Sequence, residues 1–218
     1  MTQISDNLTH IQTRISKAAL TAGRDPADVT LIAVSKTRTA EEIQAAYASG
    51  IRHFGENYLQ DALPKIAALR HLKDIQWHFI GALQSNKTRD VAANFTWLHT
   101  LDREKIARRL NDQREGMPPL KVCIQVNVDA QPQKAGVLTE DLASLLETVQ
   151  AHKNLEMCGL MAIPDPAKGE SSFVRMAILA RKHHCRVLSM GMSGDFEAAI
   201  LSGATHVRIG TAIFGPRQ

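Results

Sequence analysis

The chain has 218 residues, 44% of them hydrophobic, which is enough for one complete core but short for two full domains. Its formal net charge of +4 is spread along the chain without a lysine- or arginine-rich block, so composition favours an ordinary globular protein over a nucleic-acid-binding arm. No apolar run approaches the roughly 18 residues of a membrane span, and no targeting signal precedes residue 20. We therefore predict one domain over residues 1–218, with neither nucleic acid nor membrane as a partner.

The cysteines and histidines give no metal-ligand spacing. Cys123, Cys158 and Cys185 are odd in number and far apart, and two of them lie in apolar, strand-like runs, as buried reduced thiols do. His183 and His184 are adjacent on a predicted helix and so face different directions. We expect a cytoplasmic protein without a metal site.

In chain order, a helix is predicted over about residues 4–22, and then one unit recurs: a short apolar run, a polar turn and a segment with helical periodicity. Eight runs are predicted as strands, at residues 29–34, 52–55, 76–81, 97–101, 121–128, 155–163, 187–191 and 206–209. Seven segments between them are predicted as helices, at residues 39–49, 58–69, 86–94, 103–111, 139–151, 172–183 and 194–201.

This rhythm predicts an α/β fold, a single (β/α)8 barrel of the TIM type. Only residues 211–218 follow the last strand, so the helix at about 4–22 is expected to pack outside the barrel where the ring closes. An open doubly wound sheet is the alternative. No Gly-x-Gly-x-x-Gly fingerprint follows the first strand, which removes the best support for the dinucleotide-binding form of that alternative.

Lys36 is the first candidate for chemistry, because it ends an otherwise apolar strand at the rim where barrels build their sites. A lysine there can form a Schiff base with a carbonyl compound. Taken alone, such a lysine more often marks only the point where a strand reaches water.

Two loops near the other end of the chain favour the functional interpretation of Lys36. Ser193 and Gly194 would lie at the start of the helix after the seventh strand, and Gly210 and Thr211 close the eighth. Barrels frequently bind phosphate at these two loops, although Ser193 alone could be a helix cap and Gly210 a tight turn. A lysine opposite a phosphate cradle is how a protein holds pyridoxal 5'-phosphate (PLP).

Six segments, in order between about residues 5 and 216, resemble the pyridoxal phosphate homeostasis protein family, the YggS/PROSC-type proteins. They are residues 33–37 (AVSKT), 54–58 (FGENY), 77–81 (WHFIG) with 83–87 (LQSNK), 159–163 (GLMAI), 190–193 (MGMS) and 208–215 (RIGTAIFG). The resemblance implies a barrel like the N-terminal domain of alanine racemase, a PLP enzyme of fold type III, with Lys36 as the Schiff-base lysine. It further implies that Arg208 lies near the pyridine nitrogen, that Asn57 lies in the ring-side pocket, and that Ser193, Gly210 and Thr211 bind the phosphate.

The resemblance implies a non-catalytic protein of intracellular PLP (vitamin B6) homeostasis, and Arg208 fits this. An arginine beside the pyridine nitrogen offers only hydrogen-bond donors, which disfavours ring protonation and weakens the electron sink. The alternative is an alanine-racemase-like amino-acid racemase, which needs a second base from a C-terminal domain. The only tyrosines here are Tyr47, on a predicted outer helix, and Tyr58, next to the rim. We expect a monomer that passes PLP to PLP-dependent apoenzymes.

Three smaller expectations concern neighbouring positions. His78 is predicted as a packed, hydrogen-bonded histidine rather than an acid-base group, and Glu56 as an orienting partner of Asn57. The stretch from residue 164 to residue 187 is shorter than in the family, which leaves either a short outer helix or missing residues.

Overall fold

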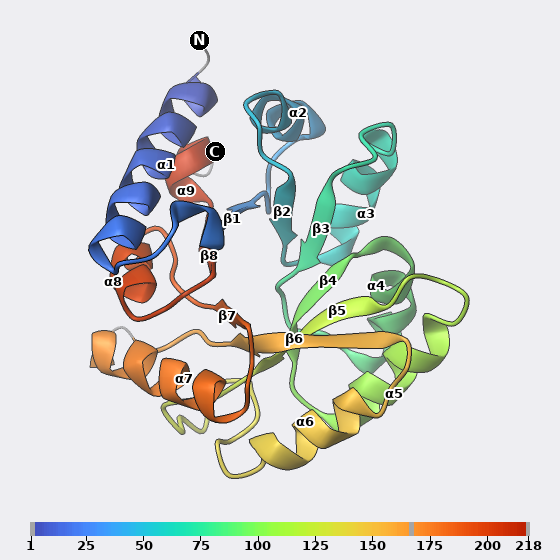
Figure 1. Ribbon diagram of the computed structural model, residues 1–218. Coiled ribbons are helices and arrows are strands. Elements are labelled where there is room, and N and C mark those ends of the chain that lie inside the picture. The colour runs from blue at the N-terminus through green and yellow to red at the C-terminus, as the bar shows by residue number, and fades with distance from the viewer. Residues whose placement is uncertain (1–2, 166–167, 217–218) are drawn as a thin grey trace.

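In the computed structural model, which describes residues 3–165 and 168–216, eight parallel strands close into a barrel (Figure 1). The strands are β1 Thr30–Val34, β2 His53–Glu56, β3 Gln76–Phe79, β4 Trp97–Leu101, β5 Leu120–Gln125, β6 Leu155–Met161, β7 Val187–Ser189 and β8 His206–Ile209. They follow one another in chain order, and β8 pairs with β1. The predicted (β/α)8 barrel is confirmed and the open doubly wound sheet is wrong. The predictions for residues 1–2, 166–167 and 217–218 lie outside the described residues.

Helices surround the barrel, and each predicted helix is present with its ends shifted by a few residues. They are α1 Gln3–Thr21, α2 Ala40–Ala48, α3 Leu59–Ala68, α4 Thr88–Asn94, α5 Glu104–Gln113, α6 Leu142–Gln150, α7 Glu170–Lys182, α8 Phe196–Leu201 and α9 Thr211–Phe214. Short 3-10 turns lie at Pro26–Asp28 and Ser85–Lys87. Because α7 has 13 residues, the short connection between β6 and β7 does not shorten the outer helix.

The N-terminal helix lies where the ring of outer helices closes. Within the described residues, the helix that follows β8 is the four-residue α9, and α1 packs against α8, α9 and α2 (Figure 1). Its buried face includes Leu8, Ile11 and Ile15, and Arg14 forms an ion pair of 2.7 Å with Glu197 of α8. The helix thus covers the apolar surface that a full eighth helix covers in a longer barrel.

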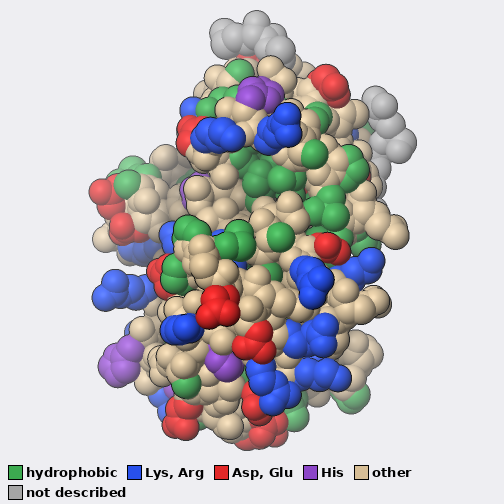
Figure 2. All heavy atoms as spheres, turned by 90° about the vertical axis from the view of Figure 1, so that its right-hand side faces the viewer, with side chains coloured by type: hydrophobic (Ala, Val, Ile, Leu, Met, Phe, Trp, Pro, Cys, Tyr) green, Lys and Arg blue, Asp and Glu red, His purple; other side chains and the backbone are tan. Residues whose placement is uncertain are grey.

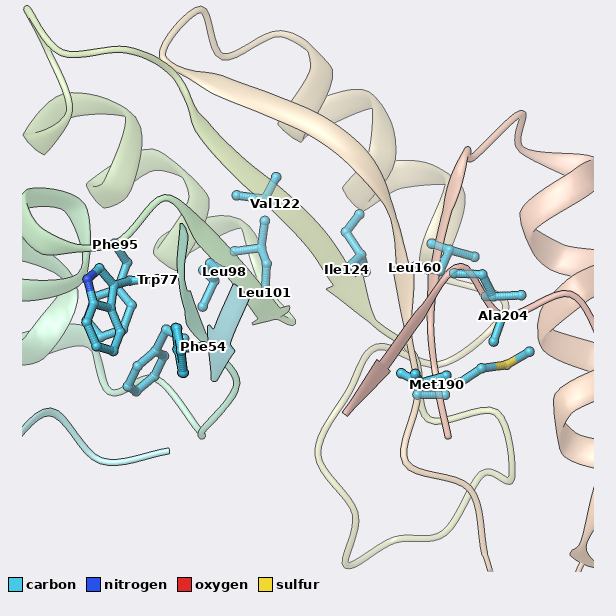
Figure 3. Packing of buried hydrophobic residues seen from close by; sticks show 14 of the residues in the cluster. Phe54, Trp77, Phe95, Leu98, Leu101, Val122, Ile124, Leu160, Met190 and Ala204 are labelled. Atoms are coloured by element: carbon cyan, nitrogen blue, oxygen red, sulfur yellow. The ribbon is translucent and has the colours of Figure 1, made fainter. Parts of the chain in front are cut away.

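The apolar core lies between the strands and the helices. Figure 3 shows two parts of it: Phe54, Trp77, Phe95 and Leu98 pack on one side, and Ile124, Leu160, Met190 and Ala204 on the other. Alternate residues of the same strands point into the barrel, where Trp97, Cys123 and Met161 form a second, smaller cluster. Four histidines share this interior, as their ring contacts with Trp97 and with one another show: His53, His78, His99 and His206. The barrel interior is therefore unusually polar.

The surface carries charges of both signs. Figure 2 shows the face on the right of Figure 1, where basic and acidic side chains lie beside one another. In the basic segment before and within α5, Arg103 donates to Asp102 at 2.6 Å and Arg109 donates to Thr88 Oγ1 at 3.3 Å, so both contact the protein itself. Across the described residues, no helix is both long and apolar enough to cross a membrane.

Candidate active site pocket

A cavity of about 360 Å³ opens at the carboxyl ends of the strands. Its wall combines the ends of β1 and β8 with the loops after β1, β2, β3, β6, β7 and β8, which lie far apart in the sequence. All seven residues predicted from the sequence line it: Lys36, Asn57, Ser193, Gly194, Arg208, Gly210 and Thr211. The sequence did not single out its other lining residues, which are Val34, Thr37, Arg38, Ile80, Ile163 and Met192.

Lys36 lies two residues beyond the end of β1, and α3 holds the backbone on both sides of it. The Ser35 carbonyl accepts from Lys65 Nζ at 2.9 Å, and the Thr37 amide donates to Asp61 Oδ2 at 2.9 Å. Thr37 has φ 64°, the left-handed region that is unfavourable for a β-branched residue. Such strain persists only where neighbouring bonds enforce it, and here those bonds fix the backbone from which the Lys36 side chain reaches the cavity.

Glu56 was predicted to orient Asn57, and this is wrong. Its carboxylate instead accepts from Ser35 Oγ at 2.6 Å and forms a buried ion pair of 2.7 Å with Lys65. Burial raises the pKa of Glu56, while Lys65 opposes the rise. The side chain thus braces the residue before Lys36 from behind the cavity wall. Sequence reasoning missed Asp61 and Lys65, although their i,i+4 spacing on one helix was a readable signal.

Asn57 contributes an unsatisfied acceptor to the cavity wall. Its Oδ1 atom is buried and has no hydrogen-bond partner within the described ranges. A buried amide oxygen without a donor costs about 1–3 kcal/mol, so this position favours a ligand that supplies one. The Asn57 backbone is itself held closely, because a Cβ built on Gly81 would come within 1.9 Å of its carbonyl oxygen.

The two predicted phosphate loops meet at one side of the cavity. Ser193 and Gly194 form the turn after β7, but α8 begins only at Phe196 with Asp195 as its N-cap residue, so the predicted helix start at 194 is wrong. The Asp195 carboxylate accepts from the Met192 amide at 2.6 Å and closes the turn. On the other loop, a Cβ on Gly210 would lie 3.0 Å from the Val34 carbonyl oxygen, so glycine permits the close approach of β8 to β1.

Arg208 is buried, with 5% of its surface exposed, yet no carboxylate in the described part of the chain lies within ion-pairing distance. It donates to Ser189 Oγ at 2.8 Å and to the Ala162 carbonyl at 3.0 Å. Among the described residues, Arg208 therefore forms no salt bridge across the barrel mouth. Burial lowers the pKa of Arg208 to about 10, so the guanidinium remains charged at neutral pH. With Lys36 and Arg38, three basic side chains and no acidic one line the cavity in the described part of the chain.

The other acid-base candidates do not line the cavity. His78 is fully buried and hydrogen-bonded to His53 and His99, as predicted. The Tyr47 hydroxyl donates to Asp74 at 2.5 Å on the outer surface, and Tyr58 is 63% exposed. Within the described ranges, no group of three or more histidine, cysteine, aspartate or glutamate side chains is placed to hold a metal ion.

Comparison with known proteins reveals the relationship. The family "alanine racemase, N-terminal domain" matches residues 6–218. The pyridoxal phosphate homeostasis protein of Pseudomonas aeruginosa is 52% identical over all of this chain and 97% of its own length. PipY of Synechococcus elongatus, whose structure contains PLP, is 36% identical with a TM-score of 0.83, over 97% of this chain and 100% of PipY.

Alanine racemase of Corynebacterium glutamicum shares the fold, with a TM-score of 0.69 at 20% identity, over 98% of this chain and 60% of the racemase. The resemblance seen in the six sequence segments is thus confirmed. The chain belongs to the pyridoxal phosphate homeostasis protein family, and its barrel is an alanine racemase N-terminal domain.

Proposed function

We propose that this protein binds PLP in the cavity as a Schiff base on Lys36 and serves intracellular PLP homeostasis. The observation that carries the proposal is the convergence of seven residues, from strand β8 and from the loops after β1, β2, β7 and β8, on one cavity whose charged side chains, among the described residues, are all basic. A phosphorylated aldehyde has the two groups that such a site recognises, a dianion and a carbon that a lysine amine attacks. The names of the relatives support the same ligand.

The residues present fit PLP. Asn57 Oδ1 needs a donor, which the ring substituents or a bound water would supply. The Ser193 and Thr211 hydroxyls, together with the backbone at Gly194 and Gly210, would hold the phosphate, and Arg208 would face the pyridine nitrogen. PLP supplies an aldehyde and an electron-withdrawing ring. The protein supplies a charged donor at the ring nitrogen, which disfavours protonation of that nitrogen.

The make-up of the cavity supports a role in holding PLP without turnover. Among its lining residues, the ionisable side chains are Lys36, Arg38 and Arg208, so no carboxylate, histidine or tyrosine stands opposite Lys36 as a second base. The recipients are proposed to be PLP-dependent apoenzymes, and the protein is proposed to be a cytoplasmic monomer. Lys36 would hold the aldehyde group of PLP, and on release a recipient's own lysine would take the place of the Lys36 amine, which would leave as a free amine.

Alanine racemisation distinguishes this proposal from the racemase alternative. Purified protein saturated with PLP is expected to exchange the Cα proton of L-alanine no faster than free PLP does in the same buffer. The readout is incorporation of deuterium from heavy water, followed by NMR. Exchange at the rate of an ordinary enzyme, roughly 1–1,000 per second, would contradict the carrier role.

The phosphate loops are tested by a double substitution. Ser193→Ala with Thr211→Ala removes two hydroxyl donors to a dianion, each worth about 1.5–3 kcal/mol, so the Kd for PLP is expected to rise at least about 100-fold. Binding of pyridoxal, which lacks the phosphate, is expected to stay unchanged. Thr148→Ala, an exposed hydroxyl on α6, is the matched control. Equal weakening for PLP and pyridoxal would place the phosphate elsewhere.

A further inference from the structure

A continuous chain of buried hydrogen bonds crosses the barrel interior. His53 Nδ1 lies 2.9 Å from His78 Nε2, and His78 Nδ1 lies 2.8 Å from His99 Nε2. His99 Nδ1 lies 2.9 Å from Ser189 Oγ, which also accepts from Arg208 at 2.8 Å. We call the three histidines with Ser189 the histidine chain. It begins at the half-buried first residue of β2, at the amino end of the barrel, and ends on the cavity arginine.

The charge of Arg208 sets the direction of every bond in the chain. A guanidinium only donates, so Ser189 Oγ accepts from it and has its own proton to give. The acceptor within reach is His99 Nδ1. His99 must then carry its proton on Nε2 and donate to His78 Nδ1, and His78 in turn donates from Nε2 to His53 Nδ1. All three rings are thereby fixed as the Nε2–H tautomer.

We infer that the histidine chain positions Arg208 and stabilises its charge in the cofactor pocket. Each group of the chain turns its acceptor atom toward the guanidinium and its proton away from it, so the negative ends of the aligned dipoles face Arg208 and replace the carboxylate that this buried cation lacks. The Ala162 carbonyl completes the arrangement, since it accepts from the second guanidinium nitrogen. Arg208 therefore faces the pocket in one orientation, with its charge compensated from within the barrel.

Neutral imidazoles are required for this role, and the surroundings keep them neutral. Burial lowers the pKa values of His78 and His99 well below the ordinary value, and the positive charge on neighbouring groups acts in the same direction. Burial and the positive charge of Lys121, at the start of β5, lower the pKa of His53 as well. Of the remaining groups, His206 on β8 faces the rings of the histidine chain. Asp195 and Cys123 oppose the lowering of the pKa of Arg208 that burial causes.

Protonation at the outer end would reverse the chain. A charged His53 donates from Nδ1, so His78 must accept on Nε2 and donate onward from Nδ1, and His99 must do the same. Ser189 Oγ then receives two donors, from His99 and from Arg208, and the dipoles oppose the guanidinium. A proton at the amino end of the barrel thus weakens the hold on Arg208 at the pocket.

Nitrogen NMR on protein labelled with ¹⁵N in its histidines tests the chain without using PLP. At pH 8 the Nε2–H tautomer is expected for His53, His78 and His99. In Ser189→Ala the preference of His99 should be lost, and Ser189→Thr, which keeps the hydroxyl, should restore it. In His53→Gln, whose amide oxygen accepts from His78, the tautomers should persist to lower pH than in the unaltered protein. Nδ1–H tautomers at pH 8 would overturn the inference.

Bound PLP supplies a second readout, which rests on the proposed function. In Ser189→Ala the Kd for PLP is expected to rise roughly tenfold, and the pH midpoint of the PLP absorbance change should shift. His206→Gln removes a barrel histidine that is hydrogen-bonded to Thr205 rather than to the histidine chain. This variant should leave both the Kd for PLP and the pH midpoint unchanged. If the unaltered protein binds no PLP, the proposed function fails while the tautomer test stands. If it binds PLP and Ser189→Ala changes neither property, the positioning role fails.

Discussion

Lys36→Ala is expected to abolish the covalent adduct that borohydride fixes on the protein after incubation with PLP. Among the residues lining the cavity, Lys36 is the one with a primary amine, and the backbone on both sides of it is held by α3. Without that amine, the aldehyde has no nucleophile in the site. Non-covalent binding through the phosphate loops should survive with a higher Kd, visible by equilibrium dialysis. The adduct itself is measured by the mass of the intact, reduced protein.

A nearby lysine gives the matched control. Lys134 reaches the carbonyl of Ile163, a cavity residue, at 3.3 Å, but does not itself line the cavity. Lys134→Ala is expected to retain the adduct at the same stoichiometry as the unaltered protein. Retention of the full adduct in Lys36→Ala, or its loss in Lys134→Ala, would move the reactive amine to another position.

Acidification from pH 7 to pH 5.5 is expected to destabilise the fold by roughly 3 kcal/mol. The cause lies in the barrel interior, where His78 and His99 have pKa values far below the ordinary value and that of His206 is lowered to about 4. In the unfolded chain these histidines titrate near 6.5. Between about pH 6.5 and 4 the unfolded state therefore binds more protons than the folded state, and stability falls as pH falls.

The magnitude follows from the number of such groups. Each histidine that is neutral when folded contributes roughly 1 kcal/mol over this pH range, and three of them contribute about 3 kcal/mol. Glu56 and Asp102, whose pKa values burial raises, act in the opposite direction with smaller shifts. The histidines therefore dominate above about pH 5, where unpaired carboxyl groups remain ionised in both states.

Urea denaturation at several pH values measures this effect. The free energy of unfolding should decline steadily below pH 6.5, and His206→Gln should remove about one third of the decline. His10, an exposed histidine on α1, provides the control, since His10→Gln should leave the slope unaltered. A free energy that is constant or rising between pH 7 and pH 5.5 would contradict the account of neutral buried histidines.

The barrel could be predicted because its signals are local and repeated. Eight apolar runs in alternation with helical periodicity are visible from β1 to β8 without knowledge of their pairing. The cavity residues could be predicted for a related reason: parallel strands bring their carboxyl ends to one rim, so residues that follow different strands meet there. Lys36 and Thr211 are 175 positions apart, yet the topology alone places both at that rim.

Other features depend on side-chain packing that no local pattern encodes. The buried ion pair of Glu56 with Lys65 requires the angle at which α3 lies on β2, and Glu56 was therefore assigned to the wrong partner. The start of α8 was misplaced because Ser193 and Gly194 belong to a turn that Asp195 closes by accepting from the Met192 amide. The histidine chain could not be predicted from the sequence either, since its four members come from β2, β3, β4 and β7 and meet only when the barrel closes.

Mapping the borohydride-reduced adduct in the unaltered protein tests the central claim most directly. Protein incubated with PLP is reduced, digested and sequenced by tandem mass spectrometry. The account predicts one pyridoxyl-phosphate group per chain, on the peptide that contains Lys36. A protein that takes up no PLP, or one that carries the group on other lysines with Lys36 unmodified, would contradict it.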